Sequence, residues 1–207
     1  MSNLKLYRHP LSGHAHRVEL LLSVLGLEAE IIDVDLMKGE QKAAEFLEKN
    51  PEGQVPVLED DGLYISDSNA ILIYLVSKYD HNHQWMPREP HLAAEVQQAL
   101  TIAAGPVAYG PASARLITLF GASYDVESTI EHAYSVLSTI ERRLEDKEWL
   151  AAARPTIADI AVYAYVARAP EGNVSLREYP GIRNWLTRIE NLDGFVPMQR
   201  SPVGLAA

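Results

Sequence analysis

The first 80 residues alternate between short apolar runs and stretches with helical periodicity. The loosely alternating residues 4–7 predict a strand, and residues 28–36 predict a second one. Between them, four apolar residues have the spacing of one helix face: Val18, Leu21, Leu22 and Leu25. Gly26 is expected to end this helix, and the charged residues 40–49 predict another short one.

A β-hairpin and a helix are predicted to complete this region. Apolar residues flank the Asp-Asp-Gly turn at residues 60–62, which is typical of a hairpin. The Ser-Asp-Ser sequence at residues 66–68 favours the start of a helix, whose apolar face continues to about Tyr79. The order β-α-β-α-β-β-α predicts an α/β domain over residues 1–79, in which a mixed sheet carries helices on its faces.

Beyond about residue 90 the pattern predicts helices and no strand. The expected helices cover residues 89–119, 125–145 and 156–168 and the stretch that contains Ile182, Trp185, Leu186 and Ile189. Thr156 and Asp159 have the spacing of a capping box. Two prolines favour a linker over residues 80–90. We therefore expect an all-helical domain over residues 91–207.

The composition is that of a globular protein without thiols of its own. Of the 207 residues, 47% are hydrophobic, which excludes disorder of the whole chain. The formal net charge is −10, so the surface repels phosphate backbones and we expect no nucleic-acid partner. Because the chain has no cysteine, disulfides, thiolate metal sites and a nucleophilic cysteine are excluded. Any thiol chemistry must use a thiol that a ligand brings.

Targeting and membrane signals are also missing from the pattern. The N-terminal residues contain no apolar core of the kind found in a secretory peptide. The apolar runs are far shorter than the roughly 18–20 residues that a membrane helix needs. We therefore expect a cytoplasmic protein with no membrane partner.

The seven histidines include two close pairs, His14/His16 and His81/His83. Neither pair has the i, i+4 spacing of a helical zinc motif, so no metal site is expected. The first pair lies beside Ser12, which suggests a Ser–His nucleophile as one interpretation. The Gly-x-Ser-x-Gly turn that would expose such a serine is missing, and an ordinary position at the start of a helix is the simpler interpretation.

Two further residue pairs have the chemistry to hold a ligand. Pro56 opens a predicted strand, where a cis bond would turn the backbone groups of Val55 toward an extended ligand; a trans proline at a strand edge is the alternative. Asp67 and Ser68 lie at a strand-to-helix turn. A serine hydroxyl and free helix N–H groups bind a carboxylate there, and an aspartate binds an ammonium group. A plain helix N-cap is the alternative.

Taken together, these segments resemble the glutathione S-transferase family over essentially the whole chain. Residues 50–58 (NPEGQVPVL) and 65–71 (ISDSNAI) are similar to the family pattern N-P-x-x-x-V-P-x-L … [ED]-S-x-A-I. Residues 12–18 (SGHAHRV) are similar to the S-x-x-x-x-R-V start of the serine-type classes, tau and zeta, and the chain as a whole resembles a bacterial, serine-type member. Residues 38–41 (KGEQ) resemble the theta-class K-G-Q-H segment, with glutamine in place of its histidine. The helical half is matched more weakly, chiefly by residues 156–161 (TIADIA).

The resemblance implies a thioredoxin-like domain that binds glutathione as co-substrate, followed by an all-helical domain. The residues it assigns to glutathione are Gln41, Lys42, Lys38, Gln54, Val55, Pro56, Asp67 and Ser68. Pro56 would be cis, with the backbone of Val55 paired with the cysteinyl part of the tripeptide. Asp67 and Ser68 would hold its γ-glutamyl end. A residue of the segment 38–42 would bind the glycyl carboxylate.

The catalytic residue implied by the resemblance is Ser12, which would donate a hydrogen bond to the sulfur, with His14 or His16 as the alternative donor. A free thiol titrates at about pH 8.5, and a hydroxyl donor at a helix N-terminus favours its anion. The thiolate would then attack an electrophile bound between the two domains. The residues expected to line that pocket are Leu11, His14, Ile102, Ala103, Pro106, Tyr109 and Phe120.

The function implied by the resemblance is that of a glutathione S-transferase acting on a small apolar electrophile, in detoxification and as a homodimer. One alternative is another glutathione-dependent enzyme on the same scaffold: a peroxidase, an isomerase, a dehalogenase or a disulfide reductase. Gly13 and His14 replace the second serine and the cysteine of the isomerases, which disfavours that activity. A second alternative is a non-enzymatic binding module, because a fold does not fix a function.

Overall fold

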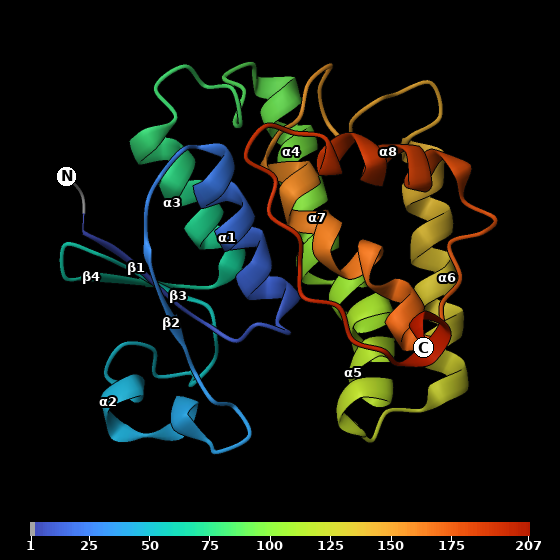
Figure 1. Ribbon diagram of the computed structural model, residues 1–207. Helices are drawn as coiled ribbons and strands as arrows, with labels where there is room; N and C mark the ends of the chain where they lie inside the picture. The colour runs from blue at the N-terminus through green and yellow to red at the C-terminus, as the bar shows by residue number, and fades with distance from the viewer. Residues whose placement is uncertain (1–2) are drawn as a thin grey trace. The chain divides into compact units, whose positions relative to one another are not determined.

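A computed structural model describes residues 3–207, which form two compact units (Figure 1). The first unit contains residues 3–81 together with Asp193–Gln199. The second contains Asn82–Leu192 and Arg200–Ala207. No helix within residues 3–207 combines the length and the hydropathy that crossing a membrane requires.

The first unit follows the predicted order of strands and helices. Its strands are β1 (Leu4–Arg8), β2 (Glu30–Asp33), β3 (Val57–Asp60) and β4 (Leu63–Ser66), and its α-helices are α1 (Gly13–Val24), α2 (Ala44–Leu47) and α3 (Ser68–Tyr79). The sheet order is β2-β1-β3-β4; β1 and β2 are parallel, and the other neighbours are antiparallel. This arrangement confirms the expected thioredoxin-like α/β class.

Helices cover both faces of this sheet (Figure 1). Leu6 of β1 is fully buried, whereas the next residue, Tyr7, contacts Phe46 of α2, with ring centroids 6.3 Å apart. Because successive side chains of a strand point to opposite faces, α2 covers the face opposite to the one where Leu6 is buried. In Figure 1, α1 and α3 lie together on that other face, where they contact each other.

The helix predicted over residues 40–49 is shorter and broken. Glu40–Lys42 form a 3₁₀ turn, and α2 is a single turn. Between them Ala43 has an extended backbone, with φ −67° and ψ 147°. Phe46 is buried in a cluster with Val34 and Val57, and this tertiary contact outweighs the local preference for one continuous helix.

The second unit is helical throughout its described residues, as expected. Its α-helices are α4 (Pro90–Ala104), α5 (Ser113–Phe120), α6 (Val126–Arg143), α7 (Ile157–Ala167) and α8 (Pro180–Glu190). Shorter elements are a π-helical turn, η2 (Ala108–Ala112), and two 3₁₀ turns, η3 (Ala169–Gly172) and η4 (Gly204–Ala206). Every residue of α7 from Ile157 to Val166 is buried, so α7 forms the centre of this unit.

The helix predicted over residues 89–119 consists of α4, η2 and α5. Gly105 ends α4, and Pro111 lies inside η2. Because proline has no N–H, it cannot continue the α-helical hydrogen bonds, and the backbone widens locally. The Ser113 hydroxyl donates to the carbonyl of Ala108 at 3.0 Å and stabilises the widened turn. The two Gly-Pro pairs, at residues 105–106 and 110–111, thus coincide with the interruption of the helix.

The segment Asp193–Gln199 belongs to the first unit, although the predicted helical domain of residues 91–207 includes it. Nε2 of His16 in α1 lies 2.9 Å from the carbonyl oxygen of Val196. Gly194, with φ +80°, approaches the end of α1 so closely that a Cβ atom there would lie 2.9 Å from the carbonyl oxygen of Ser23. Contacts between residues so distant in sequence leave no periodic signal. The predicted ranges 1–79, 80–90 and 91–207 therefore do not separate Asp193–Gln199 from the helical domain.

Candidate functional site

A cavity of about 270 Å³ in the first unit is the candidate site. It is lined by the start of α1, the loop before β3, and the turn from β4 to α3. The lining residues are His14, Asn50, Glu52, Gln54, Val55, Pro56, Ser66, Asp67 and Ser68. Five residues assigned to glutathione from the sequence thus line one cavity: Gln54, Val55, Pro56, Asp67 and Ser68.

The loop before β3 is held by the buried side chain of Asn50. Its amide nitrogen donates to the carbonyl of Gln54 at 2.9 Å, and its amide oxygen accepts from the N–H of Glu52 at 3.2 Å. Gly53 has φ +58°, and a Cβ atom there would lie 2.7 Å from the carbonyl oxygen of Gln41. Only glycine is accommodated at this position without displacement of its neighbours.

The peptide bond between Val55 and Pro56 is cis, as the family resemblance implies. Val55 precedes β3, and neither its N–H nor its carbonyl forms a backbone hydrogen bond within residues 3–207. Both groups belong to a residue that lines the cavity. An extended ligand can therefore pair with Val55 as an added strand pairs with a sheet edge.

Asp67 combines two roles that the sequence left as alternatives. It is the N-cap of α3, and its Oδ1 accepts from the N–H of Ala70 at 2.9 Å. Its backbone has φ 64° and ψ 120°, an unusual conformation for a residue other than glycine. It is also exposed and lines the cavity. The second carboxylate oxygen is thus available to a cationic ligand group.

Ser68 is fixed by a buried arginine of α1. Nη1 of Arg17 donates to the Ser68 hydroxyl at 3.2 Å and to Oδ1 of Asn69 at 2.9 Å. The hydroxyl also lies 3.4 Å from Nδ1 of His14. Sequence reasoning did not assign Arg17 to the site, although the S-x-x-x-x-R-V pattern contains it. Nor did it assign Asn50, Glu52 or Ser66, which only the fold brings to the cavity.

His14 lies at this cavity, whereas the sequence assigned it to the electrophile pocket. Burial, together with the positive charge of Arg17, lowers the pKa of His14 to about 3. Its imidazole is therefore neutral at pH 7 and combines one N–H donor with one acceptor nitrogen. A neutral ring beside Ser68 adds no charge that would repel an ammonium group in the cavity.

Ser12 is the N-cap of α1, as the simpler of the two interpretations expects. Its Oγ accepts from the N–H of Ala15 at 3.2 Å, which leaves the hydroxyl proton to be donated. Ser12 is half-buried and is not among the residues that line the 270 Å³ cavity. Nε2 of His16, the alternative donor, faces the carbonyl of Val196 instead.

The three candidates for the glycyl carboxylate differ in their contacts. Lys38 forms an exposed ion pair with Asp35 at 3.0 Å, and this contact raises the pKa of Lys38. The Gln41 amide nitrogen donates to the carbonyl of Leu36 at 3.5 Å. Nζ of Lys42 donates at 3.0 Å to the carbonyl of Glu52, a cavity-lining residue. Of these three residues, Lys42 is therefore the one whose hydrogen bond reaches the cavity wall.

The other residues predicted for the electrophile pocket lie in several elements. Leu11 is half-buried in the loop before α1. Ile102 and Ala103 belong to α4, and Ala103 is fully buried, so it presents no surface to a ligand. The remaining three are exposed: Pro106, Tyr109 and Phe120. Their common role stays a prediction.

Comparisons with known proteins identify the family of this chain. The family models for "Glutathione S-transferase, N-terminal domain" and "Glutathione S-transferase, C-terminal domain" match residues 2–77 and 100–193. Glutathione S-transferase D7 of Anopheles gambiae is 33% identical over 187 residues, which are 90% of this chain and 85% of that protein.

Solved structures show the same similarity. A glutathione S-transferase from Pseudomonas fluorescens has a TM-score of 0.89 at 33% identity and covers 95% of this chain and 99% of its own. A glutathione transferase homologue from Drosophila mojavensis, solved with bound glutathione, has a TM-score of 0.86 at 31% identity and covers 93% of this chain and 89% of its own. The chain therefore belongs to the glutathione S-transferase family.

Proposed function

We propose that this protein is a glutathione transferase that binds glutathione in the 270 Å³ cavity and activates its thiol for attack on a small apolar electrophile. The main support for the proposal is that Val55, Asp67 and Ser68 all line this one cavity. Together they offer a peptide-like edge, a carboxylate and a hydroxyl. These groups complement a tripeptide that has a backbone, an ammonium group and two carboxylates.

The proposed orientation follows from charge and hydrogen bonding. The γ-glutamyl ammonium group binds the carboxylate of Asp67, and the γ-glutamyl carboxylate accepts from the Ser68 hydroxyl and the first N–H groups of α3. The cysteinyl backbone pairs with Val55. The glycyl carboxylate then lies toward Lys42, with Gln41 and Lys38 as less favoured partners because of their own contacts.

The reactive step is a thiolate attack. The Ser12 hydroxyl and the N-terminus of α1 stabilise the sulfur anion, and the thiol proton passes to solvent. A lone pair on sulfur forms the new carbon–sulfur bond, and the leaving group departs with the electron pair of the bond that breaks. We keep Leu11, Ile102, Pro106, Tyr109 and Phe120 as the residues predicted to contact the electrophile. We further propose a cytoplasmic homodimer that acts in detoxification.

Replacing Asp67 with asparagine is expected to weaken glutathione binding about tenfold, because a neutral amide replaces the carboxylate that pairs with the ammonium group. Isothermal titration calorimetry with glutathione measures the change in Kd. Asparagine is preferred to alanine because it also caps helices and tolerates a positive φ, so α3 keeps its start.

The matched control is Asp125→Asn. Asp125 is the exposed N-cap of α6, where its Oδ1 accepts from the N–H of Ser128 at 2.8 Å. This variant carries the same chemical change and is expected to bind glutathione like the wild type. Wild-type protein that shows no heat of binding at millimolar glutathione would overturn the proposed function. Unchanged affinity of the Asp67 variant would overturn only the assignment of the γ-glutamyl end.

A further inference from the structure

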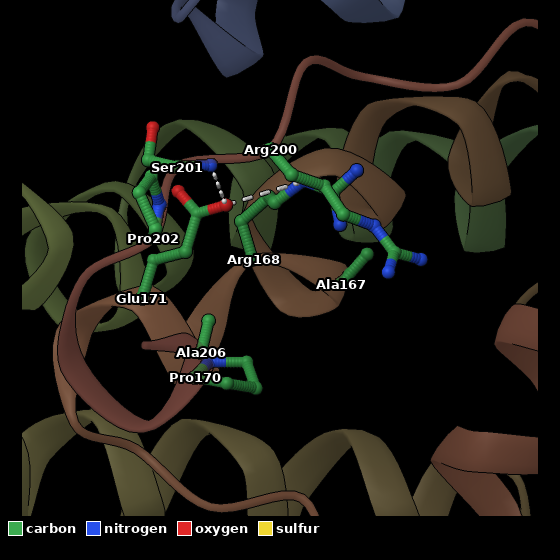
Figure 2. A pocket seen from close by; sticks show the side chains of 8 residues that line it. All are labelled: Ala167, Arg168, Pro170, Glu171, Arg200, Ser201, Pro202 and Ala206. Carbon is green, nitrogen blue, oxygen red and sulfur yellow. Dashed lines mark hydrogen bonds and ion pairs between the residues drawn. The ribbon is translucent and has the colours of Figure 1, made fainter.

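A second cavity, of about 460 Å³, is lined only by residues of the helical unit (Figure 2). It is enclosed by the end of α7, the turn η3, and the segment 200–206. The lining residues are Ala167, Arg168, Pro170, Glu171, Arg200, Ser201, Pro202 and Ala206. Its volume is within the range of small-molecule sites.

The carboxylate of Glu171 is already fully engaged behind this cavity. Its Oε2 accepts from Nε of Arg115 at 2.6 Å, and both side chains are only 2% exposed. Its Oε1 accepts from the N–H of Ser201 at 3.0 Å and lies 3.6 Å from Nε of Arg168. Glu171 therefore has little capacity left to neutralise further positive charge.

Positive charge is in excess around the cavity. Burial lowers the pKa of Arg168, and the nearby positive charges of Arg200 and Arg115 lower it further, whereas Tyr163 and Glu171 act in the opposite direction. Two guanidinium groups, those of Arg168 and Arg200, thus line the cavity beside one carboxylate, that of Glu171, which already pairs with Arg115. The guanidinium of Arg200 has no hydrogen bond or ion pair with any residue of 3–207, so its donors are available to a ligand.

The rest of the wall is apolar and held in place. Two alanines and two prolines supply it: Ala167, Pro170, Pro202 and Ala206. Gly204, with φ +60°, brings the segment 200–206 against η3, because a Cβ atom there would lie 2.7 Å from the carbonyl oxygen of Pro170. Figure 2 shows the Arg168 side chain joined to Glu171 by a dashed line, with the end of the Arg200 side chain on the side of Arg168 away from Glu171.

We propose that this cavity binds a small organic carboxylate, whose anionic group accepts hydrogen bonds from Arg200 and Arg168 and whose apolar part lies against the proline and alanine side chains. A carboxylate matches the planar donors of a guanidinium group. An apolar body of the ligand matches the remaining wall. The proposal does not depend on glutathione chemistry, since none of these residues lies in the first unit.

Ligand-observed ¹⁹F NMR with 4-fluorobenzoate as the probe tests the inference. Saturating S-methylglutathione is present throughout, so that the first cavity is filled. The wild type is expected to bind the probe, and Arg200→Glu is expected to raise its Kd about tenfold or more, because a like charge then faces the carboxylate. Arg183→Glu, an equal charge change on an exposed residue of α8, is expected to leave Kd unchanged.

The neutral analogue 4-fluorobenzamide separates charge from apolar contact. The proposal is supported if the wild type binds 4-fluorobenzoate but not 4-fluorobenzamide. Binding of 4-fluorobenzoate should then be lost in Arg200→Glu and kept in Arg183→Glu. No binding by the wild type, equal binding of benzamide, or equal loss in both variants overturns it. Circular dichroism checks the fold, and Arg200→Gln, which only removes the charge, decides the outcome if the reversal variant does not fold.

Discussion

Replacing Asp159 with alanine is expected to lower the free energy of unfolding of the helical unit by about 3–5 kcal/mol. The side chain is fully buried at the first turn of α7, the helix at the centre of this unit. Three tryptophans report on the change, because all of them lie in the second unit: Trp85, Trp149 and Trp185. Fluorescence-monitored denaturation in urea gives the midpoint and the free energy.

The size of this effect follows from the number of donors that Asp159 satisfies. Its Oδ1 accepts from the N–H of Leu150 at 3.0 Å and from Nε1 of Trp185 at 2.9 Å. Its Oδ2 accepts from the N–H of Thr156 at 2.9 Å and from the Thr156 hydroxyl at 3.3 Å. Alanine leaves these buried donors without an acceptor, and each such loss costs about 1–3 kcal/mol before the structure relaxes.

Asp125→Ala is the matched control for a helix cap without burial. Asp125 caps α6 but is exposed, so its loss is expected to cost only about 1 kcal/mol. If both variants lose the same stability, capping alone explains the role of Asp159. The additional contacts with Leu150 and Trp185 would then contribute nothing measurable.

The same carboxylate shows how far the sequence predicts this fold. The spacing of Thr156 and Asp159 predicts the capping box, and the structure contains it. Capping is local, so it leaves a local pattern. The bond from Trp185 to Asp159 joins residues 26 positions apart, and such a contact has no periodicity to reveal it.

The residues of the candidate site divide in the same way, into local features that the sequence predicts and distant contacts that it does not. The turn residues of the loop before β3 and the helix start at Asp67 are local features, and the sequence identifies both. The link from Arg17 to Ser68 spans 51 positions, so the arginine appears in the sequence only as one charge within an apolar helix. The contact between His14 and Ser68 likewise spans 54 positions, so the sequence does not reveal it.

Replacing Ser12 with alanine is expected to raise the apparent pKa in the pH profile of kcat/KM by about two units. At pH 7 a thiol with a pKa of about 6.5 is mostly thiolate, whereas one at about 8.5 is only a few per cent ionised. The rate with an activated aryl chloride should therefore fall about 25-fold at pH 7 and largely recover above pH 9. A pH titration of the ultraviolet absorbance of the bound thiolate should give the same shift of the thiol pKa.

The energy required is compatible with a single hydroxyl at the start of α1. A shift of two units corresponds to about 2.7 kcal/mol, within the range of a charge-assisted hydrogen bond supplemented by a helix N-terminus. Alanine also removes the N-cap bond to Ala15, so a loss of rate alone does not distinguish a lost hydrogen bond to sulfur from a frayed helix. Ser12→Gly resolves this, because glycine costs an N-cap only a few tenths of a kcal/mol.

Ser12 is the thiolate donor if the pH profile shifts in both Ser12→Ala and Ser12→Gly. The Ser12→Thr variant, which keeps a hydroxyl, should then have the wild-type profile. An unchanged profile in the glycine variant would instead transfer that role to His14. With a pKa lowered to about 3, its ring stays neutral across the assay range and donates through an N–H without titrating. His14→Ala would then carry the shift of about two units, and Ser12 would act only as the cap of α1.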